Sequence, residues 1–196
     1  KFSDKHLIIF GVNNIVNNKT FNSLAVVNNN LDIIEVYNKN KLVPFGEFLP
    51  LEKYLKNLGI KSITNFYNSY SSGEKRNIIN LENYEFDISF LPLICYEIIY
   101  SGRLSQKNNY DLIINISEDG WFGRSIGPHQ HFSHSIFRSI EEGKSIIRST
   151  NNGTSALVDP YGQISKMSES TYEGVIEINQ IKNPKKTFFS KYGNNM

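Results

Sequence analysis

The chain is poor in several features that would each point to a class of protein. Its 196 residues include one cysteine, Cys95, so no disulfide can form within the chain and the thiol serves either packing or chemistry. No stretch approaches the ~18 consecutive apolar residues of a membrane-spanning helix. The net charge is only +2, and the basic residues are scattered, so we expect no nucleic-acid partner. At 39% hydrophobic residues the chain can still build a sizeable core, and its length predicts one domain over residues 1–196.

The distribution of apolar residues predicts a mixed architecture. Short apolar runs between polar turns predict strands at 7–12, 23–28, 33–38, 84–94, 110–116, 145–148, 155–158 and 174–178. Helical spacing predicts helices at 50–58 and 129–143, the second ending at Gly143, and residues 98–107 can also form a helix. Strands interleaved with a few helices are typical of an α/β fold with buried sheets.

Cys95 lies where a nucleophile would be expected. It follows the apolar run 90–94, which predicts a buried strand, and it precedes a segment of helical character. A thiol at such a strand-to-helix turn points away from the end of a sheet and is accessible to a substrate. The alternative is packing, because free cysteine most often behaves as a small buried hydrophobe.

Two further segments combine reactive side chains with rigid or glycine-bearing turns. Residues 39–47 place Lys39 at a strand end and Glu47 after a Val-Pro-Phe-Gly turn, which can hold the carboxylate in one place. The alternative is a surface hairpin with two solvated charges. Residues 115–123 contain Trp121, the single tryptophan, either as a plug over the core or as an active-site rim that contacts an apolar substrate.

Three histidines, His129, His131 and His134, do not have the spacing of a metal site. The usual zinc helix has histidines four residues apart with a glutamate between them. We therefore expect capping, packing or surface roles for these side chains. We expect no metal and no cofactor.

Five motifs occur in an order that resembles a known family. They are Tyr37-x-Lys39-x-x-Leu42-Val43-Pro44-Phe45-Gly46-Glu47, Ile94-Cys95-Tyr96-Glu97, Asn115-Ile116-Ser117 with Trp121-Phe122-Gly123, Gly127-Pro128-x-Gln130-His131, and Arg148-x-Thr150-Asn151-Asn152-Gly153. Together they resemble the nitrilase-like (carbon-nitrogen hydrolase) domain of bacterial apolipoprotein N-acyltransferases. The resemblance extends from about Leu7 to Gly193. It is most specific in the Leu-Val-Pro-Phe-Gly-Glu and Trp-Phe-Gly blocks.

The resemblance implies a nitrilase-like αββα sandwich with a Glu-Lys-Cys triad. It implies that Cys95 is the nucleophile, that Lys39 is the triad lysine, and that Trp121 lies on a substrate-facing loop. It assigns supporting roles to Glu47, Tyr96 and Glu97. The implied reaction moves an acyl chain from a phospholipid, through a cysteine thioester, to the amine of an apolipoprotein's diacylglyceryl-cysteine. The implied location is the bacterial inner membrane, with the domain facing the periplasm. This chemistry suits a thiolate, which attacks esters well and leaves well.

The sequence departs from the family pattern in three places. The family's general-base glutamate and its membrane helices should both precede the first strand, and no Pro-Glu segment lies ahead of Leu7. We therefore expect an N-terminally truncated domain, a fragment whose parent protein reaches the membrane through the missing helices. Where the family usually has Asn-Asp-Ala before Trp-Phe-Gly, this chain has Glu118-Asp119-Gly120. Two alternatives remain: a soluble nitrilase-family amidase acting on small C–N substrates, and an inactive remnant.

Overall fold

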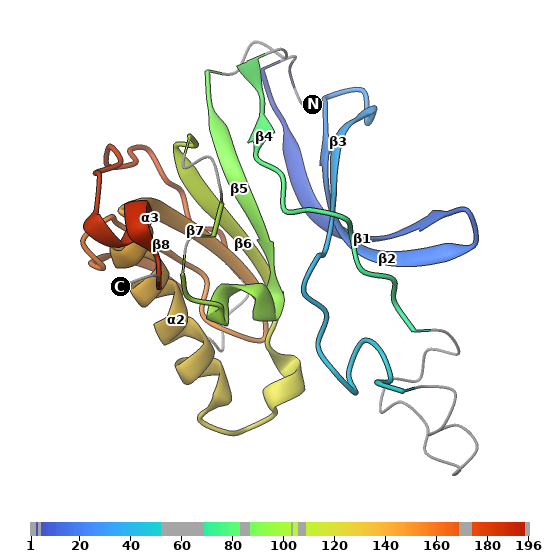
Figure 1. Ribbon diagram of the computed structural model, residues 1–196. Coiled ribbons are helices and arrows are strands. Elements are labelled where there is room, and N and C mark those ends of the chain that lie inside the picture. The colour runs from blue at the N-terminus through green and yellow to red at the C-terminus, as the bar shows by residue number, and fades with distance from the viewer. Residues whose placement is uncertain are drawn as a thin grey trace. The chain divides into compact units, whose positions relative to one another are not determined.

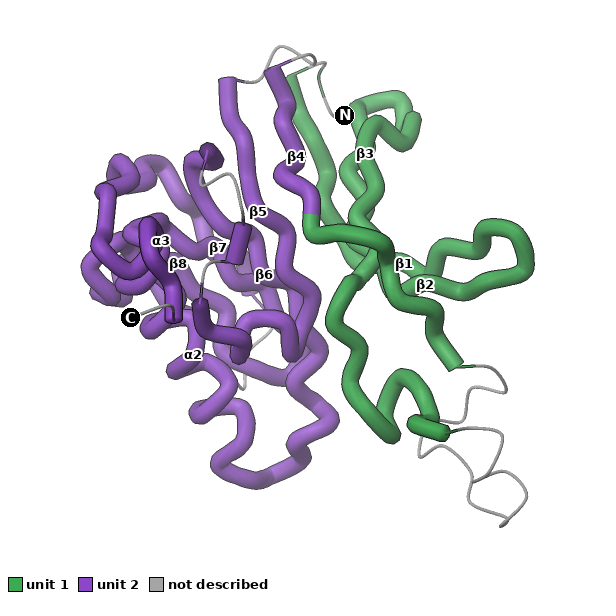
Figure 2. The backbone as a smooth tube through the Cα atoms, in the orientation of Figure 1, with its two compact units in different colours: residues 1–76 green, residues 77–196 purple. Residues whose placement is uncertain are grey.

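The computed structural model describes residues 3, 5–51, 69–82, 87–102, 104–105, 109–168 and 174–194. The chain divides into two compact units, residues 1–76 and residues 77–196 (Figure 2). Each unit contains its own sheet, and the helices α2 and α3 both belong to the second. The α/β class expected from the apolar pattern is confirmed (Figure 1). Among the described residues, no helix combines the length and apolar character needed to cross a membrane.

Unit 1 contains a three-stranded antiparallel meander in the order β1-β2-β3. The strands are β1 (Ile8–Val16), β2 (Lys19–Val27) and β3 (Ile33–Asn38). A turn with Asn17 and Asn18 at positive φ joins the first two strands, as suits a tight hairpin. The helix expected over 50–58 falls mainly on residues outside the described ranges.

Unit 2 contains a six-stranded mixed sheet in the order β4-β5-β6-β7-β8-β9. The strands are β4 (Ile79–Asn80), β5 (Ser89–Ile94), β6 (Leu112–Glu118), β7 (Ser145–Asn151), β8 (Ala156–Val158) and β9 (Ile164–Met167). The three central strands β5, β6 and β7 run parallel, so their carboxyl ends meet at one edge of the sheet. Ligands of open parallel sheets bind beyond this edge.

Helix α2 (Gly127–Glu142) covers one face of the unit 2 sheet (Figure 1). Its Phe132 packs onto a core that includes Leu91, Ile113 and Ile146 from three adjacent strands. The helix ends where expected, because Gly143 adopts the left-handed conformation (φ +63°) and its amide bonds the carbonyl of Ser139. The other helices in the described ranges are the 3₁₀ segments η2 (Cys95–Ile99) and η3 (Gly120–Phe122) and the short α3 (Phe188–Tyr192).

Two sequence-based predictions in unit 2 were wrong. Over the described part of 98–107, residues 98–102 and 104–105, the expected helix is only the end of the five-residue η2, because Tyr100 returns to extended backbone and Gly102 adopts φ +86°. The strand expected over 174–178 does not form, and β9 takes the edge position beside β8 instead. Both errors come from local patterns that tertiary pairing overrides.

Candidate active site

Unit 1 has a buried ion pair at the end of β3. Lys39 is 1% exposed, and its Nζ lies 2.9 Å from Oε1 and 2.8 Å from Oε2 of Glu47. The Glu47 carboxylate also accepts hydrogen bonds from Asn22 Nδ2 (2.8 Å) and from the amide of Val43 (2.8 Å). The alternative of two solvated surface charges is therefore wrong, because the turn places the Glu47 carboxylate next to a buried lysine.

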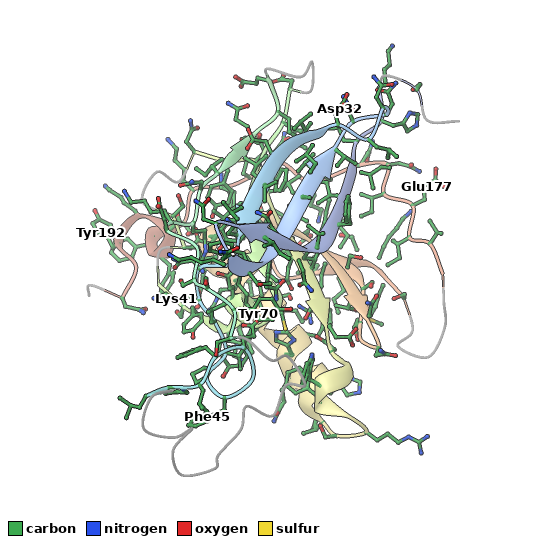
Figure 3. All side chains as sticks on the ribbon, turned by 90° about the vertical axis from the view of Figure 1, so that its right-hand side faces the viewer. Asp32, Lys41, Phe45, Tyr70, Glu177 and Tyr192 are labelled. Carbon is green, nitrogen blue, oxygen red and sulfur yellow. The ribbon has the colours of Figure 1, made fainter. Side chains whose placement is uncertain are left out.

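Backbone hydrogen bonds from residues 70–73 hold the two residues of this ion pair in place. The amide of Tyr70 bonds the carbonyl of Glu47, and the amide of Gly73 bonds the carbonyl of Lys39, both at 2.8 Å. Residue 73 must be glycine, because a Cβ there would lie 2.2 Å from the carbonyl oxygen of Asn38. Burial and the nearby Glu47 charge raise the pKa of Tyr70, against a hydrogen bond to Asn13 that lowers it. Figure 3 labels Tyr70 and Phe45 in this part of unit 1.

In unit 2 the candidate nucleophile, Cys95, immediately follows β5 and opens η2. The strand-to-helix turn expected for the nucleophile is confirmed. Cys95 adopts φ +50°, a left-handed conformation that is uncommon for a residue other than glycine. Two residues after Cys95, the side chain of Glu97 is buried, and its Oε2 accepts a hydrogen bond from the backbone amide of Ile94 at 2.9 Å. Strained backbone of this kind is concentrated at functional sites.

The strained backbone at Cys95 leads to a stability prediction. The left-handed conformation is unfavourable by about 1–2 kcal/mol for a residue with a Cβ. We expect Cys95→Gly to have a free energy of unfolding about 1 kcal/mol higher than Cys95→Ala, measured by urea denaturation. At Ile116, within β6, the order should reverse, with glycine the less stable of the two substitutions. Equal or greater stability of Cys95→Ala would contradict the inferred strain.

A second buried ion pair lies at the same edge of the sheet, between the turn after β6 and β7. The side chains of Asp119 and Arg148 are both 0% exposed, and Arg148 Nη2 lies 2.8 Å from Asp119 Oδ2. His131 of α2 completes the cluster, with Nδ1 2.9 Å from Asp119 Oδ1. Burial alone would raise the pKa of Asp119, but the hydrogen bond from His131 and the charge of Arg148 outweigh it and hold this pKa below its usual value.

The sequence motifs include Asp119, His131 and Arg148 but do not predict that these residues contact one another. A signal was available, because Arg148 ends a run of otherwise small or apolar residues and a buried charge requires a partner. His131 packs at the site, whereas His129 is exposed.

The loop after β6 carries one of the departures from the family pattern, and its two substituted residues, Glu118 and Gly120, fit together. Oε1 of Glu118 accepts the amide of Gly120 at 2.7 Å and Nδ2 of Asn152 at 3.2 Å. A Cβ on residue 120 would lie 2.6 Å from that same oxygen. The glutamate therefore occupies space that an alanine side chain would need, and glycine leaves it free.

Trp121 is 65% exposed on η3. It is therefore not a plug over the core. Its role on a substrate-facing loop stays a prediction.

Comparison with known proteins identifies the family. The family model described as carbon-nitrogen hydrolase matches residues 4–181. The chain is 41% identical over 175 residues to an apolipoprotein N-acyltransferase of Rickettsia typhi, covering 87% of this chain and 33% of the relative. It is 34% identical over 172 residues to that of Brucella melitensis, covering 87% and 32%. The chain thus spans about a third of the length of these curated relatives.

Solved structures agree on the fold. A carbon-nitrogen hydrolase superfamily protein from Xanthomonas campestris, with an arsenic adduct in its active site, superposes with a TM-score of 0.56 at 16% identity, covering 83% of this chain and 58% of that one. An amidase from Nesterenkonia gives 0.55 at 14% identity, covering 81% and 55%. The expected resemblance and the nitrilase-type fold are confirmed. With a family match over most of its length, a matching fold and a cysteine held at a strained strand end, the chain belongs to the carbon-nitrogen hydrolase family.

Proposed function

We propose that this chain is the nucleophile-bearing part of an enzyme that transfers a phospholipid acyl chain to the N-terminal amine of an apolipoprotein. The observation that carries the proposal is Cys95 itself, the single thiol of the chain, held in a left-handed turn at the carboxyl end of a central parallel strand. The relatives that support it are named for this activity. The parent protein would act at the bacterial inner membrane, on its periplasmic side.

The proposed chemistry has two steps. The Cys95 thiolate attacks the ester carbonyl of the phospholipid, and the lysophospholipid leaves as its alcohol after taking a proton. The amine of diacylglyceryl-cysteine then attacks the thioester, which forms an amide and returns the thiol. The Lys39 ammonium would stabilise the negative oxygen of each tetrahedral intermediate, and its ion pair with Glu47 would hold it in place.

The remaining proposed site residues support the nucleophile. Glu97 would fix the turn through its bond to the Ile94 amide. Tyr96, the next residue after the nucleophile, would line the site beside it. The exposed Trp121 would contact acyl chains. The altered loop before it is internally bonded through Glu118, so it can present that ring from a defined backbone.

The test is a chimera in which residues 1–196 replace the aligned segment of the Rickettsia typhi relative. We expect it to acylate a diacylglyceryl-cysteine peptide in phospholipid vesicles, detected by mass spectrometry, and Cys95→Ala to abolish the transfer. Tyr161→Phe, at an exposed turn, is the matched control and should keep full activity. A folded chimera that releases ammonia from small amides without acyl transfer would support an amidase instead. A folded chimera with neither reaction would indicate an inactive remnant.

The isolated chain should behave differently from the chimera. Because the general-base glutamate implied by the family is not among residues 1–196, we expect no acyl thioester on Cys95 when the chain alone is mixed with phospholipid. Alkylation of the same cysteine by iodoacetamide should still occur, since it needs only the thiolate. An acyl adduct on Cys95 of the isolated chain would overturn this expectation.

A further inference from the structure

Arg148 has more contacts than a single buried ion pair requires. Its guanidinium is clamped from two sides, by Asp119 through Nη2 and by the side-chain oxygen of Asn115 through Nη1. Its Nε is buried and has no hydrogen-bond partner among the described residues. A buried guanidinium held this firmly presents a fixed positive charge in a medium that screens it poorly.

The sheet register links Arg148 to the strand that ends at the nucleophile. Leu93, Asn115 and Arg148 form one row across the parallel strands β5, β6 and β7. Asn115 extends the clamp along that row, because its Nδ2 donates to the carbonyl of Leu93 at 3.0 Å. Cys95 lies two residues beyond Leu93, directly after the same strand. Arg148 is thus hydrogen-bonded, through one asparagine, to the backbone that carries the nucleophile.

Electrostatics couples the two groups directly. Burial lowers the pKa of Arg148, while the charge and hydrogen bonds of Asp119 and, more weakly, the negative charge of Cys95 raise it. A Coulomb interaction acts on both groups, so the same guanidinium attracts a negative charge on the Cys95 sulfur.

Other titratable groups lie on the elements next to the nucleophile. They are Tyr96 and Glu97 on η2, Asp119 after β6, and His131 and Arg138 on α2. Arg138 pairs with Glu141 at 2.7 Å, and Glu97 accepts the amide of Ile94.

We propose that Arg148 is an electrostatic positioning residue for Cys95, whose clamped guanidinium stabilises the thiolate while Asp119 limits how strongly it does so. The inference rests on the proposed role of Cys95 as nucleophile. It assigns the buried Asp119–Arg148 pair a part in the reactivity of the site, beyond holding β6 and β7 together. The two residues would then have opposite effects on the reactivity of Cys95. Loss of Arg148 makes the thiolate less stable, and loss of the Asp119 charge makes it more stable.

The experiment measures the rate of Cys95 alkylation by iodoacetamide between pH 6 and pH 10, on the full 196-residue chain, by intact mass spectrometry. Every alkylation event reports Cys95, because the chain has no other cysteine. We expect Arg148→Met to shift the rate profile to higher pH and to slow alkylation at pH 7 by about tenfold. A tenfold change is what a shift of the profile by about one pH unit produces. Arg148→Lys, which keeps the charge, should fall between wild type and Arg148→Met. Asp119→Asn should shift the profile to lower pH.

Opposite shifts distinguish this role from a structural one, since general loosening of the site would move all variants the same way. Shifts of Arg148→Met and Asp119→Asn in the same direction, or no shift in either, would overturn the proposal. If urea denaturation shows that single variants unfold, Asp119→Asn/Arg148→Lys is compared with Asp119→Asn/Arg148→Met. The methionine variant should then be the slower at pH 7, and equal rates would overturn the proposal. Alkylation needs no acyl donor, so this result is independent of whether the chimera transfers acyl chains.

Discussion

Replacing Glu47 by glutamine is expected to lower the free energy of unfolding by about 3 kcal/mol. The substitution keeps the shape of the side chain but leaves the ammonium of Lys39, 1% exposed, without the charge that lies 2.8 Å from it. A buried charge that loses its partner is far less stable than the pair, because it has already lost its hydration. Urea denaturation at pH 7 measures the loss. The chimera carrying Glu47→Gln should also lose acyl transfer, since the lysine is no longer held.

Two control variants test whether the loss of stability comes from the unpaired Lys39 charge. The double variant Lys39→Met/Glu47→Gln removes both charges and should recover to within about 1 kcal/mol of the native chain, because an apolar replacement of a buried pair is often close to neutral. Glu74→Gln, an exposed glutamate in the same unit, should change stability by less than about 0.5 kcal/mol. If Glu47→Gln behaves like Glu74→Gln, the ion pair does not stabilise unit 1.

Truncating Ile113 to alanine should lower the free energy of unfolding by about 2–5 kcal/mol. Ile113 is 0% exposed near the start of β6, opposite Leu91 on one side and Ile146 on the other. Removing its side chain leaves a cavity between the sheet and α2 that three adjacent strands must share. Since Cys95 and Asp119 directly follow β5 and β6, this core also supports the edge where they lie.

The same urea measurement on two related variants tests the packing argument. Ile113→Val removes one methylene and should lower stability by about 0.5–1.5 kcal/mol. Ile126→Ala removes the same atoms as Ile113→Ala from a side chain that is 67% exposed, and should change stability by less than about 0.5 kcal/mol. Similar losses for Ile113→Ala and Ile126→Ala would contradict the assignment of Ile113 to the core.

Local sequence patterns predicted much of this fold correctly. The strand over 33–38 has those bounds in the structure, and Gly143 ends α2 as expected. Such features depend on alternation, helical spacing and the conformational freedom of glycine, which act over a few residues. The position of Cys95 after an apolar strand belongs to the same class, because a buried strand that ends at a polar segment is visible in one dimension.

The errors arose where pairing at a distance decides the outcome. Residues 174–178 form a short, mainly apolar run like a strand, yet a strand exists only where a neighbouring strand accepts its hydrogen bonds, and β9 pairs with β8 instead. The segment after Cys95 has helical character, yet the chain turns at Gly102 after a single short 3₁₀ helix. In each case the local pattern allowed the predicted element, and the tertiary arrangement selected another.

The family, the α/β class, the nucleophile candidate and the Lys39 and Glu47 motif could all be read from the order of residues, because they depend on local periodicity and on motifs contiguous in the chain. Two facts required the folded chain: that Lys39 and Glu47 form a buried pair, and that Asp119, His131 and Arg148 gather from a turn, a helix and a strand at the edge where Cys95 lies. Burial and the meeting of distant side chains are set by how elements pack. The sequence therefore determines the sign of each charge. The strength of the electrostatic interactions that the charge makes depends on the partners and the solvent exposure that the fold gives it.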